Sequence, residues 1–446
     1  MNCDYELLVI GAGSGGLAAA QRAASYGVKV AIAERFKPGG ACVNYGCIPE
    51  KLLDHAASFR RLNHVAIHYG WGEDQRQFHW PEFVEAEEQH IDFLNALHQK
   101  HLEDAGVTLL RGQAYFADEH TVIINDQPVT ADKILIAVGA KPCKPAIPGI
   151  EHTITWHELY YLKEQPKSVA VMGGDPIGVK ICGSLNALGS QVTQIILEDR
   201  ILPLLDEELI YVIQDRMQQH GVQLLTQRVV EKIEPISEGF ALSLVGHSAP
   251  LIAASVLADT GRMPDTDGLQ LENVGVKLAS GMVQVDEFSR THCPHIFAIG
   301  DCTGRMPLTP SAIVQGRIFA DSEFGNHAKP VRLDLIPMSL SSHPEAATVG
   351  LSEAQARDRY GEAIACYRKH FRPLLYAITG LEERTFMKVV VNREDGDRIL
   401  GIHMVGEGAV EIVQSLAVSL RLGATKQDLD ATIGIHPSSA EELFSL

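Results

Sequence analysis

One stretch near the N-terminus constrains the fold more than any other part of the chain. Residues 5–34 read YELLVIGAGSGGLAAAQRAASYGVKVAIAE: an apolar strand, a glycine-rich turn, a helix of small residues and a second strand. In the spacing G-x-G-x-x-G, Gly11 allows a tight turn, Gly13 lets the backbone approach a pyrophosphate, and Gly16 lets the helix pack closely on the strand. Glu34 ends the second strand, where a carboxylate can accept a hydrogen bond from a ribose hydroxyl. Glycines that only form a turn are the alternative, but these elements in register predict a Rossmann-type α/β domain that binds a dinucleotide.

A second stretch repeats this pattern with one change at its centre. VAVMGGDPIGVK (169–180) again reads as a strand, a glycine turn and the start of a helix, and it is the internal repeat of the chain. Gly173 and Gly178 hold the outer glycine positions, but Asp175 stands where the phosphate-facing glycine is expected. A carboxylate there adds bulk and a negative charge that faces phosphates. We therefore expect a second Rossmann-like domain with an altered nucleotide turn.

Length, composition and charge exclude several classes of protein. The 446 residues are enough for about three domains. The net charge is −18 and no lysine/arginine cluster stands out, which argues against nucleic acid or an anionic membrane as partner. No apolar run is long enough for a transmembrane helix. The chain enters a strand at once, so no signal peptide is expected, and with eight cysteines we predict a reducing, cytoplasmic location.

Two of the cysteines lie close together in GGACVNYGCIPEKLL (39–53). On an ideal helix Cys42 and Cys47 would have Cα atoms ~8–9 Å apart, beyond the ~7 Å limit for a disulfide. A bond between them requires a distorted turn, which Gly46 and Pro49 would allow. Two structural cysteines or two metal ligands are the alternatives. A metal is not expected, because no second Cys/His pair follows at ligand spacing.

The motif GGACVNYGC-IP-K resembles the redox-active disulfide motif of the flavin-dependent pyridine nucleotide–disulfide oxidoreductases, the group of glutathione reductase, dihydrolipoamide dehydrogenase and mercuric reductase. Further segments resemble that family in the same order along the chain, so the resemblance covers essentially all of it: ILIAVGAKPCKPAIPG (134–149), IFAIGDCTGRMPLTPSAIVQGR (296–317), HPEAATVGLSEAQA and IHPSSAEE. The resemblance implies an α/β fold with two Rossmann-like domains and an α+β C-terminal dimerisation domain. It implies these limits: 1–149 and 264–333 for the FAD-binding region, 150–263 for the nucleotide-binding-like domain, and 334–446 for the dimerisation domain.

The resemblance also implies a cofactor and a set of site residues. FAD would be held by Gly11, Gly13, Gly16, Glu34, Gly40, Lys51 and Asp301. In relatives the first cysteine of the pair attacks the substrate disulfide and the second lies against the flavin as a thiolate, which assigns these roles to Cys42 and Cys47. His436 matches the catalytic base, and Glu441 matches the carboxylate that orients it. In relatives this histidine reaches the other subunit, so a homodimer acting on a small-molecule or protein disulfide or dithiol is implied.

Substrate preference is less well marked in the sequence. The tail HPSSAEELFSL is closer to glutathione reductase than to dihydrolipoamide dehydrogenase, and it lacks the terminal cysteines of mercuric reductase. Arg317 stands where glutathione reductases place an arginine for a substrate carboxylate. Gln21 and His98, however, replace an arginine and a tyrosine that those enzymes carry. We interpret His98 and His90 as exposed or pocket-lining side chains rather than metal ligands.

The nucleotide-binding repeat departs from the family at several positions. Pro176 replaces a gating tyrosine, and Lys180 replaces a glutamate that pairs with a lysine near the flavin. The two arginines that hold the 2′-phosphate of NADPH are absent, with Leu197 and Pro203 in their places; Glu198 is one position late for a ribose acceptor, and Arg262 remains. We predict a degenerate site with impaired or absent NAD(P)H use. The alternatives are weak NADH use, an NADH- or NADPH-dependent enzyme like glutathione reductase or dihydrolipoamide dehydrogenase, and a flavoprotein thiol sensor without turnover.

Charge at the flavin side yields one further prediction. Lys180 would be costly beside Lys51 near a flavin, because buried charges need partners. Glu50 lies three residues after Cys47 in the same segment. We therefore expect Glu50 to pair with Lys180, which reverses the family's usual polarity.

Overall fold

The computed structural model describes residues 3–72 and 77–446. The N-terminal region is built on a sheet of order β3-β2-β1-β6-β5-β4, with β18 also paired to β6. Strands β1, β2, β3, β6 and β18 run parallel, whereas β4, β5 and the start of β6 form an antiparallel meander. The strand bounds are β1 Tyr5–Ile10, β2 Val30–Glu34, β3 Thr108–Arg111, β4 Ala114–Phe116, β5 Thr121–Ile124, β6 Gln127–Ile136 and β18 Ile296–Ala298.

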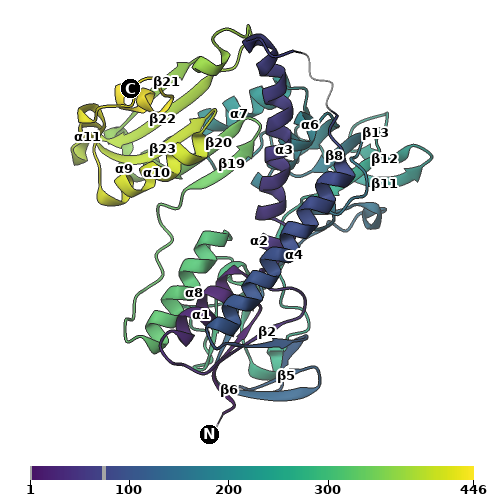
Figure 1. Cartoon of the computed structure of the whole chain (residues 1–446), viewed down its shortest axis with the longest axis vertical. Helices are drawn as coiled ribbons and strands as arrows, with labels where there is room; N and C mark the ends of the chain where they lie inside the picture. The colour runs from purple at the N-terminus through teal and green to yellow at the C-terminus, as the bar shows by residue number, and fades with distance from the viewer. Residues whose placement is uncertain (1–2, 73–76) are drawn as a thin grey trace.

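Strand β1 comes first in the sequence and lies in the middle of this sheet. Its last four residues, 7–10, are apolar and at most 4% exposed, as expected for a parallel strand covered on both faces. Helices α1 (Ser14–Ala24) and α8 (Thr309–Phe324) lie side by side next to this sheet (Figure 1). They approach closely because Gly316 faces Gly15, where an added Cβ would lie 2.4 Å from the Gly15 carbonyl oxygen.

Three more helices connect the sheet to the rest of the molecule. Helix α2 (Gly40–Asn44) is short, and the long helices α3 (Cys47–Ala66) and α4 (Trp80–Asp104) run from the first domain toward the other two (Figure 1). The chain leaves the region through β7 (Ala140–Pro142) and returns through β15 (Arg262–Pro264), which pair with each other in antiparallel fashion. A small hairpin of β16 (Leu278–Ala279) and β17 (Met282–Val283) follows the return.

The middle of the chain forms the second Rossmann-like domain. Its parallel sheet has the order β10-β9-β8-β14, and an antiparallel sheet of order β11-β12-β13 packs beside it. The strands are β8 Ser168–Met172, β9 Gln191–Ile195, β10 Gln223–Leu225, β14 Ser255–Ala258, β11 Val230–Ile236, β12 Gly239–Leu244 and β13 Leu251–Ala253. The helices are α5 Trp156–Leu159, α6 Pro176–Ala187 and α7 Glu207–Gln219.

The C-terminal domain is a five-stranded antiparallel sheet of order β19-β20-β23-β22-β21, with helix α10 against strands β20 and β23. Its elements are β19 Met338–Ser342, β20 Glu345–Gly350, α9 Glu353–Tyr360, β21 Ile364–Phe371, β22 Thr385–Asn392, β23 Arg398–Val405, α10 Ala409–Leu422 and α11 Lys426–Ala431. The predicted fold class, two Rossmann-like domains followed by an α+β domain, is confirmed by these three parts. Short 3₁₀ helices complete the described chain: η1 Ile67–Tyr69, η2 Ile150–His152, η3 Leu271–Val274, η4 Gly300–Thr303, η5 Gly361–Ala363, η6 Leu374–Tyr376, η7 Arg393–Asp395 and η8 Ala440–Ser445.

A buried charge network ties the second domain to the third. Lys388 on β22 is 1% exposed, and its ammonium lies 2.9 Å from Asp206, 2.6 Å from Glu208 and 2.9 Å from Glu353. Asp206 and Glu208 belong to the start of α7, and Glu353 opens α9. A buried ammonium needs such partners, so the network fixes how the two domains pack.

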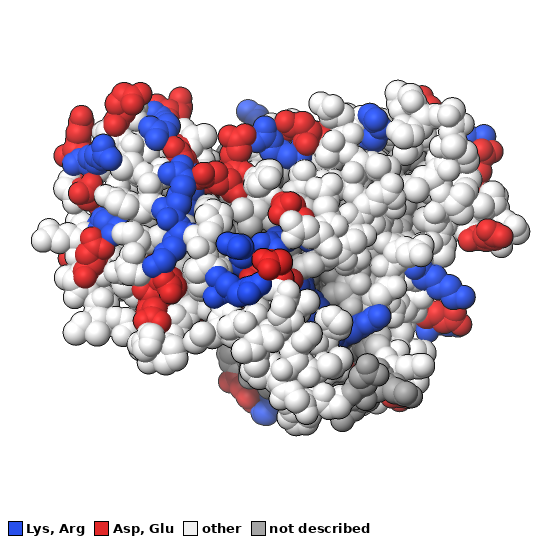
Figure 2. Space-filling view, turned by 90° about the horizontal axis from the view of Figure 1, so that it is seen from above, with Lys and Arg blue, Asp and Glu red and all other residues white. Residues whose placement is uncertain are grey.

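Two features of the structure concern possible partners: the distribution of surface charge, and the length and apolarity of the helices. Acidic and basic side chains are intermixed on the face seen in Figure 2, and neither sign covers that face as a continuous layer. Of the helices in residues 3–72 and 77–446, none is both long and apolar enough to cross a membrane.

Candidate active site

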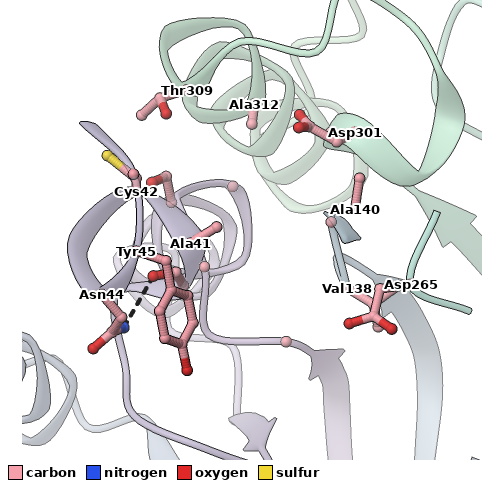
Figure 3. A pocket seen from close by; sticks show the side chains of 18 of the residues that line it. Ala41, Cys42, Asn44, Tyr45, Val138, Ala140, Asp265, Asp301, Thr309 and Ala312 are labelled. Atoms are coloured by element: carbon pink, nitrogen blue, oxygen red, sulfur yellow. Dashed lines mark hydrogen bonds between the residues drawn. The ribbon is translucent and has the colours of Figure 1, made fainter. Parts of the chain in front are cut away.

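A cavity of about 540 Å³ opens where the first sheet meets α2, α3, α6 and α8. Its wall brings together the flavin-side, redox and nucleotide-turn predictions, namely Gly11, Gly13, Glu34, Gly40, Cys42, Cys47, Asp175, Pro176, Lys180, Arg262 and Asp301. Figure 3 looks into this space, with Cys42 and Thr309 near one another at one end and Asp301, Ala140 and Asp265 on the other side. Residues from distant parts of the sequence therefore face a single cavity.

The glycine turn after β1 leaves room for the phosphates of a ligand to approach the protein backbone. An added Cβ at Gly13 would meet only the Cα of Gly40, at 3.8 Å, so a side chain there would occupy the space that the turn leaves open. Gly16 lies behind the turn, where an added Cβ would be 2.0 Å from the Gly11 carbonyl oxygen. Close packing at Gly16 and open space at Gly13 are the two properties that the motif predicts.

Glu34, the last residue of β2, has its carboxylate held in place by backbone N–H groups. The Glu34 carboxylate accepts hydrogen bonds from the backbone N–H of Ala12 at 2.8 Å and of Phe36 at 2.7 Å. Each carboxylate oxygen has further acceptor capacity, so Glu34 can still accept from ribose hydroxyls. With the α1 N-terminus beside it, this donor and acceptor set fits an adenine dinucleotide such as FAD.

Asp301 faces the same cavity from η4 and is paired. Its Oδ2 lies 3.0 Å from a guanidinium nitrogen of Arg262, whose other terminal nitrogen donates to the Pro307 carbonyl at 3.1 Å. Burial raises the pKa of Asp301, and the charge of Arg262 opposes that rise. The arginine predicted for the nucleotide is thus engaged with the acidic residue predicted for the flavin.

The two cysteines predicted to form the redox pair lie at a break between two helices. Cys42 lies in α2 and Cys47 opens α3; between them Gly46 has φ −131° and ψ −106°, outside the helical range. The sequence required such an interruption if the two sulfurs were to meet. Both residues are free thiols in the structure, and their side chains share a hydrogen bond.

The surroundings of the two cysteines lower the pKa of one thiol and raise the pKa of the other. The hydrogen bond from Cys42 lowers the pKa of Cys47 to about 6, with contributions from the Thr309 hydroxyl and from Lys180, against the effect of burial. The same shared proton, together with burial, raises the pKa of Cys42. The Cys47 sulfur lies 3.4 Å from Thr309 Oγ1 at the start of α8. Of the two thiols, Cys47 is the one whose surroundings favour ionisation.

The Glu50–Lys180 pair is confirmed. Lys180 Nζ lies 3.2 Å from Glu50 Oε2, and the two side chains are 17% and 16% exposed. Ser342 on β19 donates to the other carboxylate oxygen at 3.2 Å. Lys51 is placed differently from its predicted cofactor role: its ammonium pairs with Asp54 at 2.6 Å, and it does not line the cavity. Glu50 and Lys51 lie three and four positions after Cys47, so both are near its helix face; Glu50 lines the cavity, whereas Lys51 turns to Asp54.

The second glycine turn is occupied by the protein's own acidic groups. Gly173 adopts φ +127°, as a turn glycine must, and Pro176 begins α6 without a backbone N–H. The Gly178 N–H donates to Asp259 Oδ2 at 2.6 Å, and Asp259 is only 3% exposed. Burial and the neighbouring Asp175 raise the pKa of Asp259 to about 7, and burial also raises that of Asp175.

The predicted acid–base pair lies in the C-terminal domain. His436 Nδ1 is 3.0 Å from both oxygens of Glu441, which also accepts from the Ser438 N–H at 3.1 Å. Because Nδ1 faces the carboxylate, Nε2 is left to act as a base. The His436 side chain is 81% exposed and does not line the cavity of its own chain. The structure brings histidine and carboxylate together but leaves them apart from Cys42 within one chain.

The remaining candidates lie outside the cavity wall. Arg317 is exposed on α8, and Leu197 is 66% exposed after the end of β9. His90 is exposed on α4, and His98 on the same helix is half-buried, which lowers its pKa. Within the part of the chain that the structure describes, no group of three His, Cys, Asp or Glu side chains is arranged to hold a metal ion.

Three residues of the site were not found from the sequence. Asp259 follows β14 and reaches the turn from across the sheet, Thr309 lies 262 positions beyond Cys47, and Ser342 comes from the third domain. Asp259 had one available signal, an acidic residue after a buried apolar strand. The other two are ordinary polar residues, and only the folded chain places them.

Comparison with known proteins agrees with this geometry. The family model described as pyridine nucleotide-disulphide oxidoreductase matches residues 5–316, and the model of that family's dimerisation domain matches residues 336–445. A glutathione reductase of Nostoc sp. is 47% identical over 100% of both chains, and one of Burkholderia cepacia is 40% identical over 99% of this chain and 98% of its own. The chloroplastic/mitochondrial glutathione reductase of Pisum sativum is 36% identical over 99% of this chain and 82% of its own. Among solved structures, the HOCl-induced flavoprotein disulfide reductase RclA from Escherichia coli matches with a TM-score of 0.89 and 27% identity, covering 99% of this chain and 100% of that one.

Proposed function

Because this chain belongs to the pyridine nucleotide-disulphide oxidoreductase family, we propose that its flavin exchanges electrons with a thiol or disulfide substrate through Cys42 and Cys47, with impaired use of NAD(P)H. That it is a flavin-dependent disulfide oxidoreductase follows from the family and its relatives. The assignment of residues and the state of the nucleotide site are the proposal. When bound, FAD supplies two-electron redox chemistry to the cysteine pair.

The cysteines divide the exchange into two steps. Cys42, as a thiolate, attacks one sulfur of the substrate disulfide; a mixed disulfide forms and the first substrate thiol leaves with a proton. The Cys47 thiolate then attacks the Cys42 sulfur, which closes the Cys42–Cys47 disulfide and releases the second substrate thiol. The substrate gains two electrons and the cysteine pair loses them. The low pKa of Cys47, about 6, supports its role as the resolving thiolate.

A base must take the proton of Cys42 and return it to the leaving thiol. We assign this role to His436 of the partner subunit in a homodimer. Its Nδ1 is held by Glu441 at 3.0 Å, which leaves Nε2 free for the exchange. His436 is exposed and lies apart from the cavity of its own chain, which supports action across a subunit boundary.

One observation carries the nucleotide part of the proposal: the Gly178 N–H already donates to Asp259 at 2.6 Å. In a working turn the N–H groups at the start of the helix bind the pyrophosphate. Here one such donor is occupied by a carboxylate, Pro176 supplies none, and Asp175 adds a second acidic group. Pyrophosphate binding would have to displace one carboxylate in the presence of another.

A second candidate function is an NAD(P)H-dependent glutathione reductase. Full-length identity of 47% to a glutathione reductase favours it, and the family is defined by nucleotide use. Near the end of β9, Arg200 is held by Asp199 at 3.1 Å and Glu207 at 2.7 Å, but Arg228 makes no ion pair among the described residues. NADPH must therefore be tested together with NADH.

Anaerobic mixing separates the two candidates. The flavin-loaded protein is mixed with NADPH, NADH or a dithiol, and flavin absorbance is followed. We expect rapid bleaching by the dithiol and slow or undetectable bleaching by either nucleotide at micromolar concentration. Rapid bleaching with a micromolar half-saturation for NADH or NADPH would overturn the nucleotide part and leave the second candidate. Oxidised glutathione added to the reduced protein then tests the substrate.

A further inference from the structure

The charge pair beside the redox cysteines has a chemical consequence for one of them. Glu50 lies three residues after Cys47 on α3, so the two side chains share a helix face, and both line the cavity. A carboxylate next to a sulfur opposes ionisation of that sulfur, because two negative charges would then be neighbours. Glu50 is 16% exposed while Cys47 is exposed toward the cavity, so water screens this repulsion only in part.

The repulsion is offset by a group from another domain. Lys180 extends from α6 and reaches Glu50 Oε2 at 3.2 Å. Ser342 holds Oε1 at 3.2 Å from β19. The carboxylate is thus fixed from two sides, and the positive charge lies in the same cavity wall as the sulfur.

We propose that Lys180 is a positioning residue that neutralises Glu50 and thereby keeps Cys47 ionised and reactive at neutral pH. The other groups that face Cys47 are Cys42, which donates a hydrogen bond, the neutral hydroxyl of Thr309, and the buried phenol of Tyr160. None of these three carries a positive charge. Lys180 is the cation that forms an ion pair with Glu50; the adjacent Lys51, which also interacts with the Glu50 charge, is paired with Asp54.

The role assigned to Lys180 gives the second Rossmann-like domain a task that needs no nucleotide. Helix α6 packs against α3, and Lys180 is the side chain through which it reaches the redox pair. This inference rests on the proposed function only in that Cys47 acts as a thiolate. It holds whichever donor reduces the flavin.

The test measures Cys47 alone. In a Cys42→Ser background, iodoacetamide is added over a range of pH and alkylation of the Cys47 peptide is followed by mass spectrometry. We expect Lys180→Met to raise the pH midpoint of alkylation by about one unit, the low end of the effect of a near charge. Glu50→Gln alone should lower the midpoint, and the double variant Glu50→Gln/Lys180→Met should return it close to its starting value. Lys180→Arg keeps the charge and should keep the midpoint.

Lys133→Met is the matched control, because it removes a half-buried lysine that pairs with Glu323 at 2.5 Å and does not line the cavity. Its midpoint should equal that of the background. An unchanged midpoint in Lys180→Met, or a shift that persists in the double variant, would overturn the proposal. If Lys180→Met does not fold, the fall in Glu50→Gln and the unchanged value in Lys180→Arg decide the question. Because alkylation needs no electron donor, rapid NADH oxidation would refute the proposed function and leave this result intact.

Discussion

On the proposed function, removing the two carboxylates from the second glycine turn should strengthen the binding of NADH. Asp259→Ala frees the Gly178 N–H from its 2.6 Å hydrogen bond, and Asp175→Gly removes the side chain that stands at the phosphate-facing position. A hydrogen bond to a charged group contributes about 1.5–3 kcal/mol. At 1.4 kcal/mol per factor of ten, one regained bond to phosphate corresponds to roughly a 10- to 100-fold gain in affinity. The loss of a repelling charge at Asp175 adds to this gain.

The acidity of Asp259 gives the same prediction a pH dependence. Its pKa is raised to about 7, so at pH 6 most of the Asp259 carboxyl is neutral and at pH 8 most of it is charged. Protonation favours the approach of an anionic pyrophosphate. The half-saturation concentration of the unaltered protein for NADH should therefore rise as pH increases through 7. The double variant lacks this group and should lose that dependence.

The assay is anaerobic rapid mixing of flavin-loaded protein with NADH, followed by flavin absorbance at several pH values. We expect Asp175→Gly/Asp259→Ala to lower the half-saturation concentration at least ~10-fold at pH 8. Asp215→Ala, which removes an acidic residue from α7 of the same domain, serves as control and should change nothing. A folded, flavin-loaded double variant with an unchanged half-saturation concentration would refute the reasoning. Pro176 still supplies no N–H, so recovery to the level of an intact turn is not expected.

Three other predictions concern the redox pair, the base and the domain contact. Cys42→Ser and Cys47→Ser should each abolish disulfide exchange, and Cys42→Ser should retain a Cys47 thiolate whose long-wavelength absorbance with the flavin is lost as the pH is lowered. Full activity in Cys42→Ser would contradict the assigned roles. His436→Ala should slow exchange by about 10²–10⁴-fold, measured with saturating dithiol, and a loss below about threefold would contradict its role as base. Lys388→Met should lower the free energy of unfolding in urea by about 3–5 kcal/mol, because it strands the buried carboxylate of Asp206, whereas the exposed Lys100→Met should change it by less than about 0.5 kcal/mol. A loss below about 1 kcal/mol for Lys388→Met would show that the network does little to hold the domains.

Much of the fold was predictable because the strongest signals in this chain are local. The run 7–10 is apolar without interruption, and glycines follow it at fixed spacing, so one short segment specifies strand, turn and helix together. The repeat at 169–180 specifies a second such unit by the same logic. The Glu50–Lys180 contact was also predictable, since a lysine and a carboxylate that each require a partner were both assigned to the flavin side.

The contacts that were not predictable all join segments that are distant in the sequence. Asp259 reaches Gly178 across 81 positions, and nothing in the local sequence of either residue signals the other. Lys51 shows that a place in a motif does not by itself determine which side chain a residue contacts. Its lysine type and its place in the motif suggested the cofactor, but an acidic residue one turn further along the helix, Asp54, is also within its reach. Its ammonium pairs with Asp54 instead.

Both departures from the family pattern meet on a single helix. Asp175 and Pro176 lie at the start of α6, in the turn predicted to bind a nucleotide, and Lys180 on the same helix lies near Cys42 and Cys47. One short segment therefore lines both the nucleotide turn and the cysteine site. A change that weakened phosphate binding would remove the need for the glycine and the free N–H groups, but it would not remove the need for a packed α6 against α3. Under that condition the helix can keep its place and exchange its charges, provided that each new charge has a partner. Lys180, the new cation on this helix, has Glu50 as its partner. The contact of α6 with α3 and the Glu50–Lys180 pair therefore do not depend on whether the turn at the start of α6 binds a nucleotide.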